Sequence, residues 1–273
     1  MRILTITIFL LLAYSCNCYA DIQSKVIRLH TSTTTTNSGL MKQLIQNFEA
    51  QTGYTIKLSS FGSGRALRNA REGLADLVLV HAPIAEQSFV EAGFGIERTL
   101  LMQNNFILAG PSNDPANVSS TDNVINAFRN IQKTNASFIS RGDDSGTHKK
   151  ELSIWKKTGI YPFGEWYIEM GMGMKDALNY ASQENAYILV DRATWLTLQQ
   201  DIKIAELLTS GARLNNPYHI ILVNPKKVKT VNYKASKALR NWLISPVAQT
   251  LIKNFKIGSR QLFEPAIGLS DLN

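Results

Sequence analysis

Short apolar, β-branched runs alternate with amphipathic segments along the chain. The apolar runs predict strands at residues 26–29, 55–58, 77–80, 106–109, 136–139, 187–190 and 220–223. Between the first two, Leu40, Leu44 and Phe48 recur at helical spacing, and the pattern ends near Gly53, a typical residue for a helix C-terminus. Similar patterns predict helices over residues 65–73, 124–132, 149–157, 175–182 and 235–244. This alternation indicates an α/β protein with largely parallel sheets.

Two places along the chain look like connections between two lobes. The predicted strand at 106–109 runs into Gly110 and Pro111 and then into a polar stretch, whereas Pro217 precedes the predicted strand at 220–223. We therefore expect one lobe formed by residues 21–108 and 220–273, and a second formed by residues 109–219. Two crossing strands would join the lobes and leave a cleft between them.

The N-terminal residues 1–20 read as a secretory signal peptide. Arg2 precedes an apolar run over residues 3–13, and small residues precede a possible cleavage site before Asp21. Both cysteines, Cys16 and Cys18, lie in this segment, so the mature protein would carry no thiol. A lipoprotein cut before Cys16 is the less favoured alternative. No later segment approaches the roughly 20 apolar residues of a transmembrane helix, so we predict a periplasmic protein without membrane insertion.

The net charge of +8 favours an anionic partner, but charge alone does not choose among nucleic acid, membrane and small oxyanion. The lysines are scattered, and the cluster at residues 226–229 is more typical of a solvated turn than of a nucleic-acid patch. The histidines show no metal-ligand spacing; they are His30, His81, His148 and His219. We therefore expect neither nucleic-acid binding nor a bound metal cation.

Two junctions between predicted strands and helices carry neutral donors for an anion. Residues 31–39 contain a run of threonines that includes Thr33 and Thr34, and residues 61–65 hold Ser63 between two glycines. Such junctions aim unpaired backbone N–H groups and the positive end of the helix dipole at one point. Taken alone, the first is more readily a capped helix start and the second a plain turn.

A third junction, residues 141–147, has the sequence RGDDSGT and offers the strongest set of donors. Arg141 provides two parallel donors and a charge that persists at any relevant pH. Asp143 is well placed to hold that guanidinium in one orientation. The remaining donors would be Ser145, Gly146 and Thr147. The alternative is a capped helix with a surface salt bridge. We favour it less, because so many donors lie at one junction.

A secreted serine hydrolase is the main alternative from another class, because Ser145 lies near His148 and acidic residues. The nucleophile-elbow pattern is absent, however. A serine and a histidine three residues apart at a helix start also lack the geometry of a base oriented by a third group. No general base accompanies the predicted donors, so we expect a binding protein and not an enzyme.

Nearly the whole chain resembles the tungstate-binding proteins of ABC transporters, the TupA type. The matching segments are residues 37–40, 62–64, 80–83, 141–150, 191–192, 194–196, 255–256 and 261–263. The resemblance implies a type II periplasmic-binding-protein fold that holds tungstate, and often molybdate, between two closing lobes. It also implies an ABC permease and its ATPase as partners, no cofactor, and an oxyanion site. The implied site residues are Thr33, Thr34, Ser63, Arg141, Ser145, Gly146 and Thr147. We expect a monomer.

Phosphate- and sulfate-binding proteins of the same fold are the nearest alternative, because phosphate-binding proteins look similar at residues 141–147. Those proteins typically carry an aspartate before the Ala-Pro step, where it accepts the proton of hydrogen phosphate. His81 occupies this place here, directly before Ala82 and Pro83. Tungstate and molybdate carry no proton at neutral pH, so the missing carboxylate favours them, whether or not His81 touches the anion.

Overall fold

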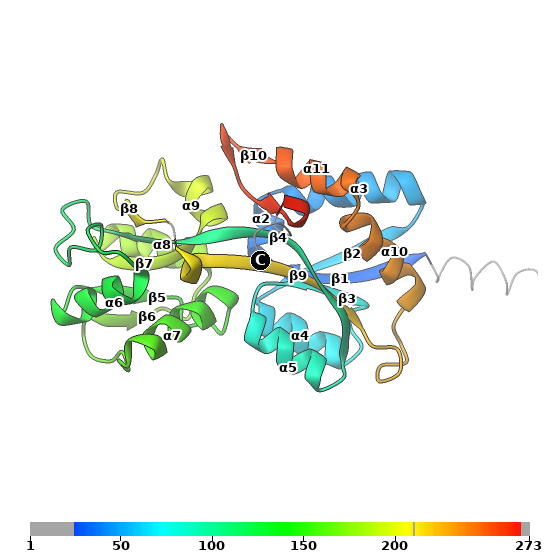
Figure 1. Cartoon of the computed structure of the whole chain (residues 1–273), viewed down its shortest axis with the longest axis horizontal. Coiled ribbons are helices and arrows are strands. Elements are labelled where there is room, and N and C mark those ends of the chain that lie inside the picture. The colour runs from blue at the N-terminus through cyan, green and yellow to red at the C-terminus, as the bar shows by residue number, and fades with distance from the viewer. Residues whose placement is uncertain (1–24, 210, 269–273) are drawn as a thin grey trace, which may run out of the picture.

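The computed structural model describes residues 25–209 and 211–268 (Figure 1). The predicted signal peptide and both cysteines lie outside the described residues. Within the described part of the chain, no helix is both long and apolar enough to cross a membrane.

One mixed sheet runs through the molecule in the strand order β2-β1-β3-β9-β4-β7-β5-β6, and β8 and β12 also pair with β4. The strands are β1 (Val26–Ser32), β2 (Thr55–Phe61), β3 (Leu77–Val80), β4 (Gly95–Gly110), β5 (Phe138–Ser140), β6 (Tyr167–Glu169), β7 (Tyr187–Asp191), β8 (Ala205–Leu208), β9 (Asn215–Val223) and β12 (Glu264–Pro265). β10 (Lys256–Ile257) and β11 (Arg260–Gln261) form a separate pair. The β1–β2, β1–β3, β5–β6 and β5–β7 pairs are parallel.

Helices cover the sheet on both faces (Figure 1). They are α2 (Thr33–Asn37), α3 (Leu40–Thr52), α4 (Ser63–Arg71), α5 (Pro83–Glu91), α6 (Val124–Lys133), α7 (Gly146–Thr158), α8 (Met174–Gln183), α9 (Arg192–Leu198), α10 (Tyr233–Leu243) and α11 (Pro246–Asn254). Parallel strands followed by helices confirm the predicted α/β class. The expectation of largely parallel sheets is wrong, because β4 and β9 pair antiparallel with each of their neighbours.

The two longest strands, β4 and β9, cross between two lobes (Figure 1). One lobe contains β1 to β3, α2 to α5, α10 and α11, and the other contains β5 to β8 and α6 to α9. β4 pairs with β9 as far as Asn105 and with β7 from Phe106 onward. The two-lobed arrangement joined by crossing strands is therefore present, while the residue boundaries expected for the lobes stay predictions.

Several elements differ from the sequence prediction. The threonine run, expected as a loop, contains α2, where the Thr35 hydroxyl donates to the Ser32 carbonyl at 2.8 Å. α7 begins at Gly146 and not near Lys149, because Ser145 already caps it. β5 begins at Phe138, two residues later than expected. The structure also adds α5, α9 and α11 to the predicted helices.

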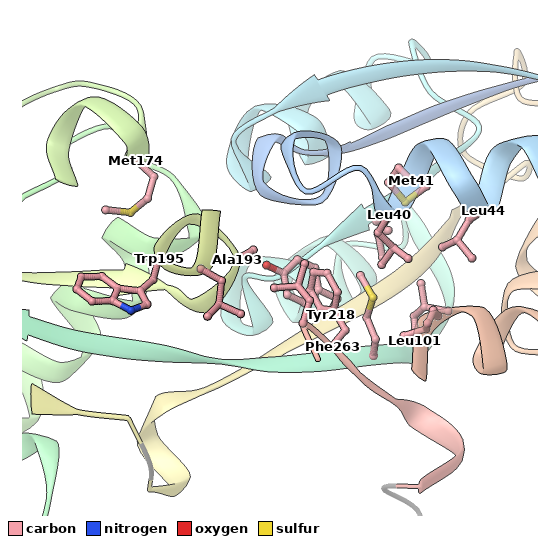
Figure 2. Packing of buried hydrophobic residues seen from close by; sticks show 14 of the residues in the cluster. Leu40, Met41, Leu44, Leu101, Met174, Ala193, Trp195, Tyr218 and Phe263 are labelled. Carbon is pink, nitrogen blue, oxygen red and sulfur yellow. The ribbon is translucent and has the colours of Figure 1, made fainter. Parts of the chain in front are cut away.

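A continuous hydrophobic core extends along the crossing strands into both lobes (Figure 2). Leu40 and Leu44 of α3 pack in it from one side, and Met174 of α8 and Trp195 of α9 join it from the other. Tyr218 of β9 lies between them, fully buried. This core fixes β4 and β9, and with them the ends of the neighbouring strands from which α2, α4 and α7 begin.

Candidate anion-binding site

The three donor-rich junctions predicted from the sequence meet between the lobes. β1 leads into α2 and β2 into α4 in one lobe, and β5 leads into α7 in the other. The loops touch: a Cβ added to Gly62, which precedes α4, would lie 3.7 Å from the Cα atom of Ser145. Helix starts from both lobes therefore face one shared space.

A cavity of about 620 Å³ lies at this meeting point. Its lining residues are Thr33, Thr34, Asn37, Ser38, Gly62, Arg141, Asp143, Gly173, Met174, Lys175, Asp176, Ala193, Thr194, Thr197 and Leu198. Of the predicted site residues, Thr33, Thr34 and Arg141 line the cavity. The others are buried and are not among its lining residues: Ser63, Ser145, Gly146 and Thr147. Gly146 instead borders a second cavity of about 350 Å³, together with His81. The structure thus brings the predicted residues together, but at two depths.

The guanidinium of Arg141 is buried and oriented by one carboxylate. Its Nη2 atom donates to Oδ2 of Asp143 at 2.5 Å, and the backbone N–H of Ser145 donates to Oδ1 of the same residue at 3.2 Å. The predicted contact between Asp143 and Arg141 is therefore present. The Nε atom of Arg141 is buried and has no hydrogen-bond partner within the described residues. A charged donor without an acceptor in a buried place suits an anionic ligand.

The first turn of α7 adds further donors. The Oγ atom of Ser145 accepts from the backbone N–H of His148 at 3.2 Å, so its own hydrogen remains available. The amides of Gly146 and Thr147 have no acceptor inside the helix, as in the first turn of any helix. The Oγ1 atom of Thr147 is buried and finds no partner in the part of the chain described. An unpaired buried hydroxyl is costly, and an oxygen of a bound anion would satisfy it.

In the other lobe, Thr34 faces a buried carboxylate across the interlobe boundary. Its Oγ1 atom lies 3.5 Å from Oδ2 of Asp191, the last residue of β7. Asp191 also accepts from the backbone N–H and the hydroxyl of Thr194, at 2.9 Å and 2.7 Å. Thr194 alone already gives this carboxylate two donors, so the Thr34 hydroxyl, at the longer distance of 3.5 Å, can turn to a bound anion instead.

Ser63 and His81 are linked but do not line the cavity. The Oγ atom of Ser63 accepts from the backbone N–H of His81 at 3.4 Å. The Nδ1 atom of His81 lies 2.8 Å from Oδ1 of Asn216, and its ring stacks on Tyr218 with centroids 4.6 Å apart. Burial is the main cause that lowers the pKa of His81. The structure therefore favours a histidine whose Nδ1 atom is satisfied within the protein by Asn216, and not one that touches the anion.

The arrangement lacks the features of a serine hydrolase. The Nδ1 atom of His148 accepts from the backbone N–H of Asp144 at 3.1 Å, and its Nε2 atom has no hydrogen-bond partner within residues 25–209 and 211–268. The Ser145 hydroxyl accepts from the backbone N–H of His148, and among the described residues no hydrogen bond joins it to the His148 ring. No cluster of three or more potential metal ligands occurs among the residues described. The site therefore offers donors for binding, without a nucleophile and base pair.

Comparison with known proteins shows the family of the chain. The family model described as a PBP superfamily domain matches residues 20–247. The chain is 41% identical over 231 residues to the tungstate-binding protein TupA of Peptoclostridium acidaminophilum, which covers 84% of this chain and 81% of that protein. The chain belongs to the TupA family.

Solved structures of TupA-family proteins share the fold. The tungstate ABC transporter protein from Geobacter sulfurreducens is 37% identical, with a TM-score of 0.76, over 85% of this chain and 99% of that one. The tungstate-binding protein TupA from Desulfovibrio alaskensis G20 is also 37% identical, with a TM-score of 0.78, over 88% and 98%. These relatives confirm the predicted resemblance and the two-lobed periplasmic-binding-protein fold. Their names describe a tungstate ABC transporter and a tungstate-binding protein.

Some residues of this TupA-family cavity were missed by the sequence analysis. They are Asn37, Ser38, Lys175, Asp176, Thr194 and Thr197. Asp191, which does not line the cavity but contacts Thr34, was missed as well. Asn37, Ser38, Asp191 and Thr194 carried a signal, since all four lie in segments that resemble the TupA family. Lys175 and Asp176 begin α8, and the sequence predicted that helix without any hint that it borders the cleft. Distant residues of this kind reach the site only through the packing of the second lobe.

Proposed function

We propose that this chain captures tungstate, and also molybdate, with high affinity in the periplasm and delivers it to an ABC importer. The observation that carries the proposal is a pair of buried donors without partners in the described chain, Arg141 Nε and Thr147 Oγ1, beside the interlobe cavity of a TupA-family protein. Relatives that bear the name tungstate-binding protein support the choice of ligand.

The proposed site combines neutral and charged donors from both lobes. They are Thr33, Thr34, Ser63, Arg141, Ser145, Gly146 and Thr147. A dianion with four oxygens needs many converging donors, because a buried charge is costly unless it is paired and hydrogen-bonded. Asp143 neutralises part of the charge of Arg141, so the amides and hydroxyls provide much of the remaining attraction.

We propose an anion without a proton as the ligand, in preference to hydrogen phosphate. His81 stands where phosphate-binding proteins typically carry an aspartate, and its ring is turned toward Asn216. Asp191, the buried carboxylate nearest Thr34, is already served by donors.

The proposed transport role implies partner proteins. A permease and its ATPase would receive the anion from a monomer whose lobes, residues 21–108 with 220–273 and residues 109–219, close on it. No cofactor takes part. The predicted signal peptide, residues 1–20, would direct the protein to the periplasm.

Isothermal titration calorimetry on residues 21–273 tests the proposal. We expect one site per chain for tungstate and for molybdate, with sulfate and phosphate much weaker. Arg141→Ala should abolish most of the affinity, whereas Arg129→Ala, which alters an exposed arginine that donates to Asn126, should leave it unchanged. Phosphate binding as tight as tungstate binding would overturn the ligand, and unchanged binding by Arg141→Ala would overturn the site.

A further inference from the structure

The ring of His81 packs against the first residue of α7 across the interlobe boundary. A Cβ atom built on Gly146 would lie 2.7 Å from Cε1, 2.8 Å from Nε2 and 3.0 Å from Nδ1 of His81. Real Cβ contacts are longer than these distances, so any side chain at position 146 would collide with the ring. His81 follows β3 in one lobe, and Gly146 begins α7 in the other.

Backbone conformation does not explain why position 146 carries glycine. Gly146 lies in helical backbone and is not among the glycines with positive φ. The first turn of a helix accepts most residues, and alanine is the best helix former. The close approach of His81 is therefore the feature of this structure that excludes a side chain.

The ring of His81 is held in place from several directions. Its Nδ1 atom lies 2.8 Å from Oδ1 of Asn216, and the Asn216 amide donates to Oδ1 of Asn104 at 2.8 Å and to the Tyr218 hydroxyl at 3.2 Å. The ring also stacks on Tyr218 at an interplanar angle of 11°. Asn104 belongs to β4, and Asn216 and Tyr218 belong to β9, so the crossing strands themselves anchor the ring.

We propose that His81 is a positioning residue that sets how closely the first turn of α7 approaches the opposite lobe. The backbone N–H groups of Gly146 and Thr147 then lie close enough to Thr33 and Thr34 for both lobes to bind the same anion. His81 does not line the cavity, so it acts through Gly146 and not by touching the ligand. This inference rests on the proposed function, because it concerns the geometry of the proposed oxyanion site.

A double-mutant cycle tests this role, with tungstate affinity measured by calorimetry. Gly146→Ala should weaken binding by about thirtyfold or more, because the methyl group holds the lobes apart, while the unfolding midpoint of the ligand-free protein stays unchanged. In the His81→Ala background, Gly146→Ala should cost less than about threefold, because the ring is gone. His81→Ser serves as the second background if His81→Ala folds poorly.

Three outcomes would overturn the inference. If Gly146→Ala binds tungstate as tightly as the natural chain, the His81 ring moves aside and does not set the approach of α7. Equal losses from Gly146→Ala with and without the His81 ring would show that the two residues act independently. A merely structural clash would lower the unfolding midpoint of Gly146→Ala, and removal of the ring would restore it. A lowered midpoint that accounts for the loss of binding would therefore also overturn the inference.

A second readout does not require tungstate binding. Spin labels on Glu72→Cys in one lobe and Lys156→Cys in the other report the interlobe distance, since both residues are exposed. We expect Gly146→Ala to remove the shortest distance population and Gly146→Ala with His81→Ala to restore it. Failure of the natural chain to bind tungstate would refute the proposed function alone. Identical distances in all variants would refute the role of His81.

Discussion

The Nη2 atom of Arg141 lies 2.5 Å from Oδ2 of Asp143, and the other oxygen of that carboxylate accepts from the backbone N–H of Ser145. One side chain thus holds both the charged donor and the start of α7. This relationship matters for binding because both residues border the interlobe cavity. Asp143 orients the donors, although its own charge opposes an anion.

We predict that Asp143→Ala weakens tungstate binding by about tenfold, or roughly 1.4 kcal/mol, because the loss of orientation outweighs the removal of a like charge. The charge of Asp143 is already largely offset by its ion pair with Arg141. Asp143→Asn is the matched control, since its amide oxygen still accepts from Ser145, and it should lose less. Calorimetry distinguishes the cases. Tighter binding by Asp143→Ala would mean that repulsion dominates.

Thr147→Val should separate binding from stability. The Thr147 hydroxyl is buried and unpaired within the described residues, so its replacement by a methyl group should leave the free energy of unfolding of the ligand-free protein unchanged or slightly higher. Tungstate binding should weaken by about 2 kcal/mol, the range for a hydrogen bond to a charged group.

Thr35→Val is the control for this substitution. The Thr35 hydroxyl lies 2.7 Å from the Thr31 hydroxyl and donates to the Ser32 carbonyl at 2.8 Å. Its loss should lower the free energy of unfolding by about 1–3 kcal/mol, because a buried acceptor loses its donor. Urea unfolding measures both variants. A clear loss of stability in Thr147→Val would show that its hydroxyl has a structural partner.

Glu151, one turn along α7 from Thr147, should make stability depend on pH. Burial raises the pKa of Glu151 to about 7, although Tyr167 donates to it at 2.7 Å. The folded protein therefore binds this proton more tightly than the unfolded chain. The resulting stabilisation is fully present below the ordinary pKa of 4.5 and is lost as the pH rises through about 7.

We predict that the natural chain loses about 3 kcal/mol of unfolding free energy from this group between pH 4.5 and pH 8, and that Glu151→Gln does not. Urea unfolding across this range measures the slope. Glu184→Gln, at an exposed glutamate, should keep the slope of the natural chain. An unchanged slope in Glu151→Gln would show that Glu151 does not titrate there.

The elements with a continuous hydrophobic pattern could be predicted from the sequence, and those that depend on distant partners could not. Only residues 106–109 of β4 were predicted, because Gln103, Asn104 and Asn105 interrupt the apolar pattern, whereas β9 supplies the backbone partners of these residues in the fold. α2 was missed because threonine is β-branched and favours strands. Hydrogen bonds from its hydroxyls to Ser32 support the helix instead.

The same distinction applies to the candidate site. The contact between Arg141 and Asp143 is local, so the sequence predicted it. The contact of Thr34 with Asp191 joins residues 157 positions apart, and the contact of His81 with Gly146 joins two lobes. Neither has a local signal, because both arise from the way β4 and β9 bring the lobes together.

Anomalous X-ray diffraction at the tungsten L3 edge, from crystals of residues 21–273 grown with tungstate, tests the central claim most directly. We predict one strong peak per chain in the interlobe cavity, within hydrogen-bond distance of the Arg141 guanidinium and the Thr147 hydroxyl. A peak away from these residues, or no peak at saturating tungstate, would contradict the account.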